Sequence, residues 1–473
     1  AYDELFFLQL VQAQVRHQQT VAQPGIPFER TNELIKPLHQ ALPFELTEAQ
    51  ARVLREIFSD MASPRRMSRL LQGDVGSGKT AVALFSMLLA LESGYQAALM
   101  APTEILAEQH ARKLRQMLDP LGVEVQLLTG RLSAGDRREA LEGIASGSAR
   151  IAIGTHALIQ EGVEFHNLGL VVVDEQHRFG VRQRMALVER ESRPAVLVMS
   201  ATPIPRSLAM ALYGDLDLSI LDELPPGRKP VETKLKTPGK RKEVYRILDK
   251  EMDAGRQAYL VYPLVDDSDK LDLRSATEEY RRLSEDVFPH RKLGLLHGQL
   301  PGSEKEAVMR GFLEREIDLL VATTVIEVGI DIPNATVMVI EHAERFGLSQ
   351  LHQLRGRVGR GGEKSTCILI SQPGEMAGER LKIFQATSDG FEIARADLQI
   401  RGQGDLFGAQ QHGRDPILSF ADLTRDEDLL REAQLRARER VSEDPELSGP
   451  GNQKVRALLH ARHDEKLRLF GVG

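Results

Sequence analysis

A glycine-rich turn between an apolar run and a helical pattern constrains this chain more than any other stretch. Residues Gly73 to Thr80 have the spacing G-x-x-x-x-G-K-T, with an apolar run from Met67 to Leu71 before them and a helical pattern from Ala81 to Leu91 after them. This strand–loop–helix context is what a phosphate-binding loop requires, because glycines let successive N–H groups point at phosphate oxygens beside a helix N-terminus. The sequence therefore predicts a nucleotide site.

The residues of this turn have separate expected roles. Lys79 would reach the β- and γ-phosphates, and the Thr80 hydroxyl would hold Mg²⁺. The nucleotide-binding set expected from this stretch is Gly73, Asp74, Gly76, Ser77, Gly78, Lys79 and Thr80.

Two carboxylates follow a second apolar run, from Leu170 to Val173. In phosphate-loop enzymes an acid at such a strand end holds Mg²⁺, and its neighbour can orient the attacking water. We expect Asp174 to be the acid on the metal side and Glu175 to be the base that activates water, with capping of the next helix as the alternative. For His177 a functional role and an ordinary hydrogen-bonding role between domains stay equally open.

Composition limits the class of protein. A chain of 473 residues should form two to four domains. Its single cysteine excludes a disulfide framework and a thiolate metal site, and suits a reducing cytoplasm. No apolar stretch is long enough to cross a bilayer, so no membrane partner is expected. The net charge of −7 gives no global attraction for nucleic acid, so motifs must carry any such claim.

Two series of alternating strands and helices predict an α/β fold with two tandem doubly wound lobes. The expected strands of the first series are 97–101, 123–128, 150–153, 170–174 and 195–200. Those of the second are 258–262, 292–296, 318–322, 336–341 and 365–371. Such alternation implies parallel sheets covered by helices on both faces, with ligands at the carboxyl ends of the strands. Because only the first lobe has a phosphate loop, the pattern suggests a motor with a cleft between its lobes.

The domain boundaries follow from a proline-rich stretch and from the strand pattern. We expect a helical segment over 1–42, a first lobe over 43–223, a second lobe over 224–372 and a mostly helical tail over 373–473. The linker begins with Leu224-Pro225-Pro226. In the tail, 424–441 is so highly charged that we expect a solvated helix.

A cluster of arginines marks the second lobe. A helix is expected over 349–358, and a spacing of three places Arg357 and Arg360 on one helix face. Arginines that face a γ-phosphate across a cleft act as fingers, worth about 10³–10⁵ in rate. A solvated basic face is the alternative, but two lobes with one phosphate loop favour fingers.

Two further patterns are weak by themselves. Thr47 and Gln50 have the spacing of a capping box at a helix start. Ser200 and Thr202 follow a buried strand, where hydroxyl groups are common caps.

Taken together, these segments resemble the ordered motif set of superfamily 2 helicases and translocases, whose lobes are RecA-like. The matching segments are 73–80, 101–110, 174–177, 200–202, 322–333 and 353–360. The resemblance implies ATP as the nucleotide. It also implies further nucleotide contacts from Phe44, Thr47, Gln50 and Asp331. Finally, it implies coupling of hydrolysis to movement through His177, Ser200, Thr202 and Gln353.

Finer features look like the RecG family of bacterial branched-DNA translocases. They are the segments 174–181, 224–230 and 262–268. A transcription-repair coupling factor is the nearest alternative, but it usually has a second acid where Gln176 stands. A DEAD-type motif at 174–177 would favour an RNA helicase, but this chain has Asp-Glu-Gln-His there. A scaffold that only switches with the bound nucleotide would not need Glu175, Arg357 and Arg360, so their presence argues against that class.

The tail also resembles these translocases. Residues 389–405 and 410–413 are similar to the TRG element, in which a helical hairpin and a loop convert lobe closure into steps along duplex DNA. Arg380, Arg401 and Gln411 match the residues that link hairpin and loop.

The resemblance implies contacts with the phosphate backbone of branched or forked duplex DNA, without reading of bases. The residues concerned are Pro102, Thr103, Thr129, Gly130, Thr155, His156, His297, Thr323 and Thr324. It further implies a monomer in the bacterial cytoplasm with single-stranded-DNA-binding protein as a partner. RecG-like proteins carry an N-terminal wedge domain that splits strands, and nothing before residue 40 has its length. We therefore expect DNA-stimulated ATPase activity with poor fork unwinding.

Overall fold

The computed structural model describes residues 1–21, 24–160, 162–175, 193–225, 229–263, 269–323, 330–372, 374–401, 421–423 and 425–459. Their contacts group into two units, one of residues 1–224 with 398–473 and the other of residues 225–397. The four segments expected from the sequence stay a prediction.

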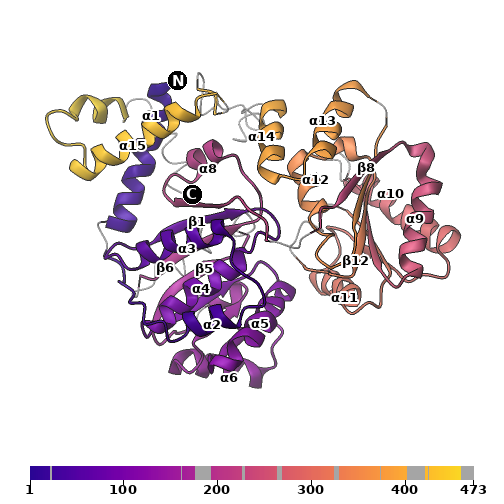
Figure 1. Ribbon diagram of the computed structural model, residues 1–473, viewed down its shortest axis with the longest axis horizontal. Helices are drawn as coiled ribbons and strands as arrows, with labels where there is room; N and C mark the ends of the chain where they lie inside the picture. The colour runs from indigo at the N-terminus through magenta and orange to yellow at the C-terminus, as the bar shows by residue number, and fades with distance from the viewer. Residues whose placement is uncertain are drawn as a thin grey trace. The chain divides into compact units, whose positions relative to one another are not determined.

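The first unit is built on a parallel sheet of seven strands in the order β3-β4-β2-β5-β6-β1-β7; Figure 1 labels β1, β5 and β6 of this sheet. The strands are β1 (Ser68–Gly73), β2 (Gln96–Met100), β3 (Val125–Leu128), β4 (Ile151–Gly154), β5 (Leu168–Val173), β6 (Ala195–Ser200) and β7 (Asp217–Leu221). Most of them are buried apolar runs, as in parallel sheets covered on both faces. The α/β class and the expected strands are confirmed, and β7 is an addition at one edge.

Helices follow most strands of the first unit. They are α2 (Ile35–Ala41), α3 (Glu48–Met61), α4 (Lys79–Glu92), α5 (Glu104–Leu118), α6 (Ala134–Ser146) and α8 (Arg206–Leu212), with 3₁₀ turns at Asp119–Leu121 and His156–Ile159. Helix α4 is buried on nearly every side because its sequence is almost entirely apolar. The chain therefore fixes the start of α4, which carries Lys79, firmly inside the unit.

The second unit has a parallel sheet of six strands in the order β10-β11-β9-β12-β13-β8. The strands are β8 (Glu232–Lys236), β9 (Gln257–Val261), β10 (Leu293–Leu296), β11 (Leu319–Ala322), β12 (Ala335–Ile340) and β13 (Thr366–Ile370). The helices are α9 (Arg241–Asp253), α10 (Asp269–Arg282, continued by a π-helix at Leu283–Val287), α11 (Gly302–Leu313), α12 (Leu348–Arg355), α13 (Glu375–Ala386) and α14 (Gly390–Arg401). Short 3₁₀ turns lie at Pro238–Lys240 and Ala343–Arg345. The second expected lobe is thus confirmed as an α/β unit.

The first and last long helices pair with each other although they come from opposite ends of the chain. Helix α1 (Tyr2–Arg16, followed by a π-helix at His17–Val21) packs along α15 (Glu427–Glu443) (Figure 1). The buried residues of α15 are Leu430, Ala433, Ala437 and Val441. The expected helix is present, but the expectation that it is solvated was wrong for one face, because these residues recur at helical spacing and form an apolar stripe within the charged run.

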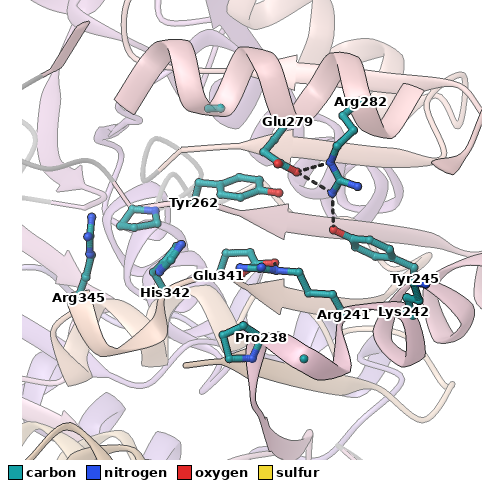
Figure 2. Close-up of a pocket in the computed structure, with 13 residues that line it drawn as sticks. Pro238, Arg241, Lys242, Tyr245, Tyr262, Glu279, Arg282, Glu341, His342 and Arg345 are labelled. Atoms are coloured by element: carbon teal, nitrogen blue, oxygen red, sulfur yellow. Dashed lines mark hydrogen bonds and ion pairs between the residues drawn. The ribbon is translucent and has the colours of Figure 1, made fainter. Parts of the chain in front are cut away.

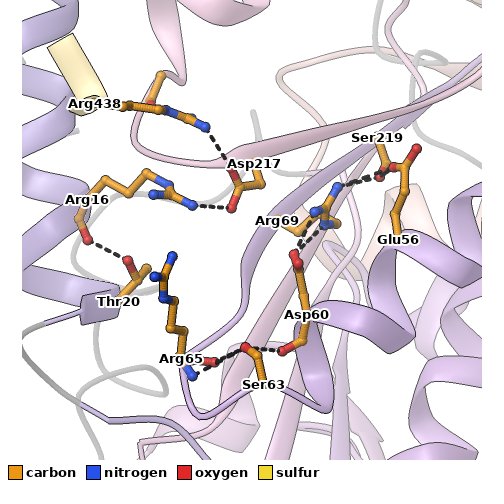
Figure 3. Close-up of polar contacts among 11 residues, drawn as sticks. Arg16, Thr20, Glu56, Asp60, Ser63, Arg65, Arg69, Asp217, Ser219 and Arg438 are labelled. Atoms are coloured by element: carbon orange, nitrogen blue, oxygen red, sulfur yellow. Dashed lines mark hydrogen bonds and ion pairs between the residues drawn. The ribbon is translucent and has the colours of Figure 1, made fainter. Parts of the chain in front are cut away.

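An ion-pair network joins this helix pair to the sheet. Asp217, the first residue of β7, accepts hydrogen bonds from Arg16 of α1 at 2.7 Å and from Arg438 of α15 at 3.1 Å (Figure 3). Near it, Arg69 of β1 donates to Asp60 and to the Ser219 hydroxyl. The network lies at the amino ends of the strands, whereas ligands of parallel sheets bind at the carboxyl ends.

None of the helices in the described part of the chain is both long enough and apolar enough to span a membrane.

Candidate nucleotide site and nucleic-acid interface

The predicted phosphate loop lies between β1 and α4. Gly76 and Gly78 have φ angles of +80° and +86°, which a residue with a Cβ rarely adopts. A Cβ on Gly78 would also lie 2.1 Å from Nε2 of Gln50, and a Cβ on Gly73 would lie 2.5 Å from Oγ of Ser77. The backbone of the loop therefore favours glycine at Gly76 and Gly78, whereas a Cβ on Gly73 would crowd the side chains of Ser77 and Leu221.

Lys79 is buried at the first turn of α4. Its ammonium group donates to the carbonyl oxygens of Gly73 at 2.8 Å and of Asp74 at 2.9 Å. The hydroxyl of Ser77 is buried and has no hydrogen-bond partner among the described residues. An orphaned donor beside a buried cation at a helix N-terminus fits a phosphate group.

The Thr47–Gln50 pair forms the capping box that its spacing predicts. The Thr47 hydroxyl accepts from the Gln50 N–H at 3.1 Å, and Oε1 of Gln50 accepts from the Thr47 N–H at 3.0 Å. Nε2 of Gln50 also donates to the carbonyl oxygen of Ser77 at 2.9 Å. Gln50 thus caps α3 and contacts the phosphate loop. Phe44 is 41% exposed just before this cap, and its contact with the nucleotide stays a prediction.

Asp174 follows β5 and lies against a histidine that the sequence did not single out. Nε2 of His110, on α5, is 2.9 Å from Oδ2 of Asp174. Burial by itself raises the pKa of Asp174, but the hydrogen bond from His110 and the charges of His110 and Lys79 hold the pKa below its ordinary value. A carboxylate that stays ionised is what a magnesium ligand requires. Because 64 residues separate His110 from Asp174, no spacing rule indicates their contact.

Glu175 has a φ angle of +51°. Left-handed backbone at a residue other than glycine costs about 1–3 kcal/mol and gathers at functional sites. This conformation is a local feature of the acid that we expect to activate water.

The sheet brings the phosphate loop, the acids and the Ser200–Thr202 pair to one edge. Strands β5, β6 and β1 are neighbours, and Gln72 pairs in register with Ser200. The hydroxyls of Ser200 and Thr202 lie 2.7 Å apart. Gln72, which the sequence did not single out, donates to the carbonyl oxygen of Thr202 at 3.2 Å. The strand before the phosphate loop therefore holds the Ser200–Thr202 segment directly.

The arginine cluster of the second unit departs from the expected helix. Helix α12, which carries Gln353, ends at Arg355, and Gly359 has a φ angle of +80°. Because the helix ends before Arg357 and the backbone at Gly359 is left-handed, the expectation that Arg357 and Arg360 share one helix face was wrong. Arg357 is buried in the turn that follows α12.

Arg360 forms an ion pair with Asp331, and its Nε donates to the carbonyl oxygen of Gly356 at 3.0 Å. Two residues with separate expected roles, one on the nucleotide and one as a finger, are thus in direct contact within the second unit. Their roles stay predictions.

Arg355 links α12 to α13, a function that sequence reasoning missed. Its guanidinium donates to the carbonyl oxygens of Phe384 at 3.0 Å and Thr387 at 2.9 Å, and lies 4.1 Å from the centre of the Phe384 ring. Arg380 of α13 donates in the other direction, to the carbonyl oxygen of Phe346 at 2.7 Å. The sequence shows Arg355 only as a further arginine beside Arg357 and Arg360. Its partners lie about thirty residues further along the chain, so their contact with Arg355 cannot be inferred from spacing.

In the first unit, the residues expected to contact DNA gather at one sheet edge. Strands β3, β4 and β2 are neighbours whose last residues pair in register. The segments that follow them hold Thr129 and Gly130, Thr155 and His156, and Pro102 and Thr103.

Two of these residues are already bonded within the unit. The Thr103 hydroxyl caps α5, and the Gly130 N–H donates to Glu104 at 2.8 Å. By contrast, Oγ1 of Thr155 is buried without a hydrogen-bond partner among the described residues.

In the second unit, His297 and Thr323 follow the adjacent strands β10 and β11. The Thr323 N–H donates to the carbonyl oxygen of Leu296 at 3.1 Å. Over the described stretches, Nδ1 of His297 and Oγ1 of Thr323 are buried without hydrogen-bond partners. Burial, and then the charge of Lys305, lowers the pKa of His297, so its imidazole stays neutral.

Several expected site residues lie outside the described residues. They are His177, Thr324 and Gln411, and the side chain of Arg401 at the end of α14.

Comparisons with family models cover most of the chain in three parts. The model of the DEAD/DEAH box helicases matches residues 47–211, and the model of the helicase conserved C-terminal domain matches residues 239–362. The model described as ATP-dependent DNA helicase RecG, domain 3, C-terminal, matches residues 387–466.

Curated relatives and solved structures agree with these models. ATP-dependent DNA helicase RecG from Synechocystis sp. is 49% identical over 97% of this chain and 55% of its own length. The same helicase from Thermotoga maritima is 52% identical over 91% of this chain and 55% of its own length. That from Streptococcus pneumoniae is 46% identical over 94% of this chain and 67% of its own length. The chain therefore spans about half the length of the first of these relatives.

A structure of RecG bound to a three-way DNA junction superposes with a TM-score of 0.78 at 49% identity, covering 91% of this chain and 56% of that one. The helicase MrfA bound to DNA, at 19% identity and a TM-score of 0.56, covers 78% of this chain and 56% of its own, and shares the fold. With these relatives, the chain belongs to the RecG family of ATP-dependent DNA helicases.

Proposed function

We propose that this chain is the motor of an ATP-dependent translocase on duplex DNA that remodels branched DNA, such as stalled replication forks and Holliday junctions, in recombination and repair. The observation that carries the proposal is the meeting of the phosphate loop, Asp174 and Glu175 at one sheet edge, in a chain 46–52% identical to named DNA helicases.

In the first unit, backbone N–H groups of the loop and the Lys79 ammonium would hold the nucleotide phosphates. The Thr80 hydroxyl and the ionised Asp174, held by His110, would hold Mg²⁺. Glu175 would take the proton of the attacking water. ATP supplies the phosphoryl transfer whose free energy drives movement. The phosphate loop and the acids follow strands of one sheet edge, β1 and β5 with β6 between them, and this arrangement supports the proposed roles.

In the second unit, Arg357 and Arg360 are proposed to complete hydrolysis as fingers. The coupling residues are proposed to be His177, Ser200, Thr202 and Gln353. Arg355 bonds Phe384 and Thr387 at the end of α13, directly before the proposed translocation element at 389–405, which supports a link between the arginine cluster and that element.

DNA is proposed to bind along the carboxyl edges of the two sheets. Buried polar atoms without partners among the described residues, on Thr155, His297 and Thr323, support this assignment, because native proteins seldom leave such groups unsatisfied. Hydroxyl and N–H groups bind phosphates without reading bases, so binding should not depend on sequence. We also propose a monomer acting in the cytoplasm, with single-stranded-DNA-binding protein as a partner.

Displacement of a triplex-forming strand from long duplex DNA tests the proposal, because it reports movement along the duplex rather than unwinding. We expect displacement that requires ATP. ATP hydrolysis is measured in parallel with duplex DNA, branched DNA, single-stranded RNA and no polymer. Stimulation by both DNAs supports the proposal, whereas strong stimulation by RNA alone would overturn it.

A further inference from the structure

A cavity of about 720 Å³ lies within the second unit and contains none of the residues expected to contact the nucleotide or DNA (Figure 2). It is formed by the carboxyl ends of β9 and β12, the start of α9 and the end of α10. The residues that matter here are Arg241, Lys242, Tyr262, Arg282, Glu341 and Arg345. Its volume is within the usual range of ligand pockets, about 300–1,000 Å³.

Both carboxylates of the cavity are neutralised by arginines. Glu341, which is buried, accepts from Nε and Nη2 of Arg241 at 2.8 and 2.9 Å. Glu279 accepts from Nε and Nη2 of Arg282 at 3.1 and 2.8 Å. The described lining of the cavity therefore offers no free carboxylate to a cation.

Two more cations line the cavity without an acid. Lys242 and Arg345 have no ion pair with any described residue. Among the described residues that line the cavity, four cationic side chains against two carboxylates leave two positive charges in excess. A cavity with this balance selects an anion.

The start of α9 adds to this charge. The helix begins at Arg241, its N-cap residue is Lys240, and no side chain caps it. The 3₁₀ turn at Pro238–Lys240 precedes the helix, and the Arg241 N–H donates to the carbonyl oxygen of Pro238. The contribution of this helix start to the cavity is therefore the positive end of its dipole, which favours an anion.

The hydroxyl of Tyr262 supplies an independent indication of a ligand. It is buried without a hydrogen-bond partner among the described residues. Figure 2 shows the ring between Glu279 and Glu341, with the hydroxyl directed into the ring of side chains. Burial raises the pKa of Tyr262 well above its ordinary value, so the hydroxyl keeps its proton. It can therefore donate a hydrogen bond to a ligand oxygen in the cavity.

The position of the cavity identifies the anion. The sheet order β10-β11-β9-β12 places the ends of β9 and β12 directly beside the ends of β10 and β11, which hold His297 and Thr323. Neighbouring strands lie about 4.8 Å apart. We propose that this cavity binds a phosphodiester group of a nucleic-acid strand and extends the DNA contact of the second unit from β10 and β11 to β9 and β12. This inference rests on the proposed function.

Charge-removing variants test it. Lys242→Gln with Arg345→Gln removes the two cations that have no acid, and Tyr262→Phe removes only the hydroxyl. The matched control is Arg246→Gln, which removes a charge from an exposed residue of α9 outside the cavity. Binding of a fluorescent duplex is measured by anisotropy over a range of salt concentrations, and the unfolding midpoint of each variant is measured to confirm that it folds.

Loss of one phosphate contact should reduce the slope of log K against log salt concentration by about 0.9, which is about an eightfold weaker affinity at about 0.1 M salt. The double variant should show this change and Arg246→Gln should not. Tyr262→Phe should weaken binding without a change of slope, since it removes a neutral donor.

An unchanged slope and affinity in the double variant, with salt-dependent binding by the wild type, would overturn the cavity assignment and leave the proposed function intact. A double variant that loses binding of inorganic phosphate or ADP but keeps its DNA affinity would also overturn it, because the cavity would then hold free anions. Failure of the wild-type chain to bind duplex DNA would count against the proposed function itself.

Discussion

Asp217 is held between arginines from the two ends of the chain, and its replacement by asparagine measures what this contact contributes. Arg16 and Arg438 reach its two oxygens at 2.7 and 3.1 Å. Asparagine has nearly the same shape and keeps one oxygen. It removes the negative charge that both guanidinium groups contact. Arg438 already has a lowered pKa, because of burial and then the charge of Arg16, so the cation pair has little other compensation.

The size of the effect follows from the exposure of the side chains. Arg16 and Asp217 are 21% and 22% exposed, and Arg438 is 31% exposed. Removing one partner of a buried ion pair costs about 3–5 kcal/mol, whereas an exposed pair contributes about 0–1 kcal/mol. Because these groups are mostly buried and two arginines lose their partner, we expect a loss of about 3 kcal/mol in the free energy of unfolding. At about 2 °C per kcal/mol for a large domain, the midpoint of the first unit should fall by about 6 °C.

Scanning calorimetry gives the measurement, with Glu427→Gln as the control. Glu427 forms an exposed pair with Arg431 on the same helix α15, and its loss should lower the midpoint by no more than about 1 °C. Equal midpoints for the two variants would show that the network at Asp217 does not hold the helix pair to the sheet.

The same pair of proteins has a defined pH dependence. Burial raises the pKa of Asp217, but the charge and hydrogen bond of Arg16, with Arg438, hold the pKa below its ordinary value. A carboxylate with a lowered pKa in the folded state contributes its stability above the unfolded value of about 3.9 and loses it as the pH falls toward the folded value. The difference in unfolding free energy between wild type and Asp217→Asn should therefore be constant from about pH 8 to about pH 5, and shrink below about pH 4. A difference that grows on acidification contradicts the assignment.

Four further substitutions address the nucleotide site and the proposed translocation residues. Lys79→Ala should abolish ATP hydrolysis with an unchanged circular dichroism spectrum, and retained hydrolysis would exclude Lys79 from phosphate binding. His110→Ala should raise the Mg²⁺ concentration for half-maximal hydrolysis by about 10–100-fold, because Asp174 loses the hydrogen bond that orients it; an unchanged requirement would make this contact merely structural. Arg401→Ala or Gln411→Ala should keep hydrolysis but impair triplex displacement, and normal displacement by Gln411→Ala would refute the hairpin assignment.

Sequence reasoning located the sheets well for a physical reason. Parallel strands buried on both faces are continuous apolar runs, such as β5 and β12, and they stand out from the amphipathic helices between them. Strand β8 did not stand out. This strand lies at the edge of the sheet, and its residues are exposed or only partly buried. Its sequence Glu-Thr-Lys-Leu-Lys is therefore not an apolar run.

The candidate site was predicted where a motif is local and missed where it depends on folding. The strand–loop–helix arrangement around Lys79 is contained in one stretch of sequence. The contact of His110 with Asp174, and that of Arg355 with the end of α13, join residues from different elements. The helix expected over 349–358 ends earlier, at Arg355. The spacing of the side chains stays helical through Arg357, but the left-handed backbone at Gly359 is not helical.

The pairing of α1 with α15 also determines how the two units are connected. The chain leaves the first unit after residue 224 and returns to it at residue 398, so the second unit is an insertion held by two covalent tethers rather than by one. A single proteolytic cut at the proline-rich linker would leave the units joined through the second tether.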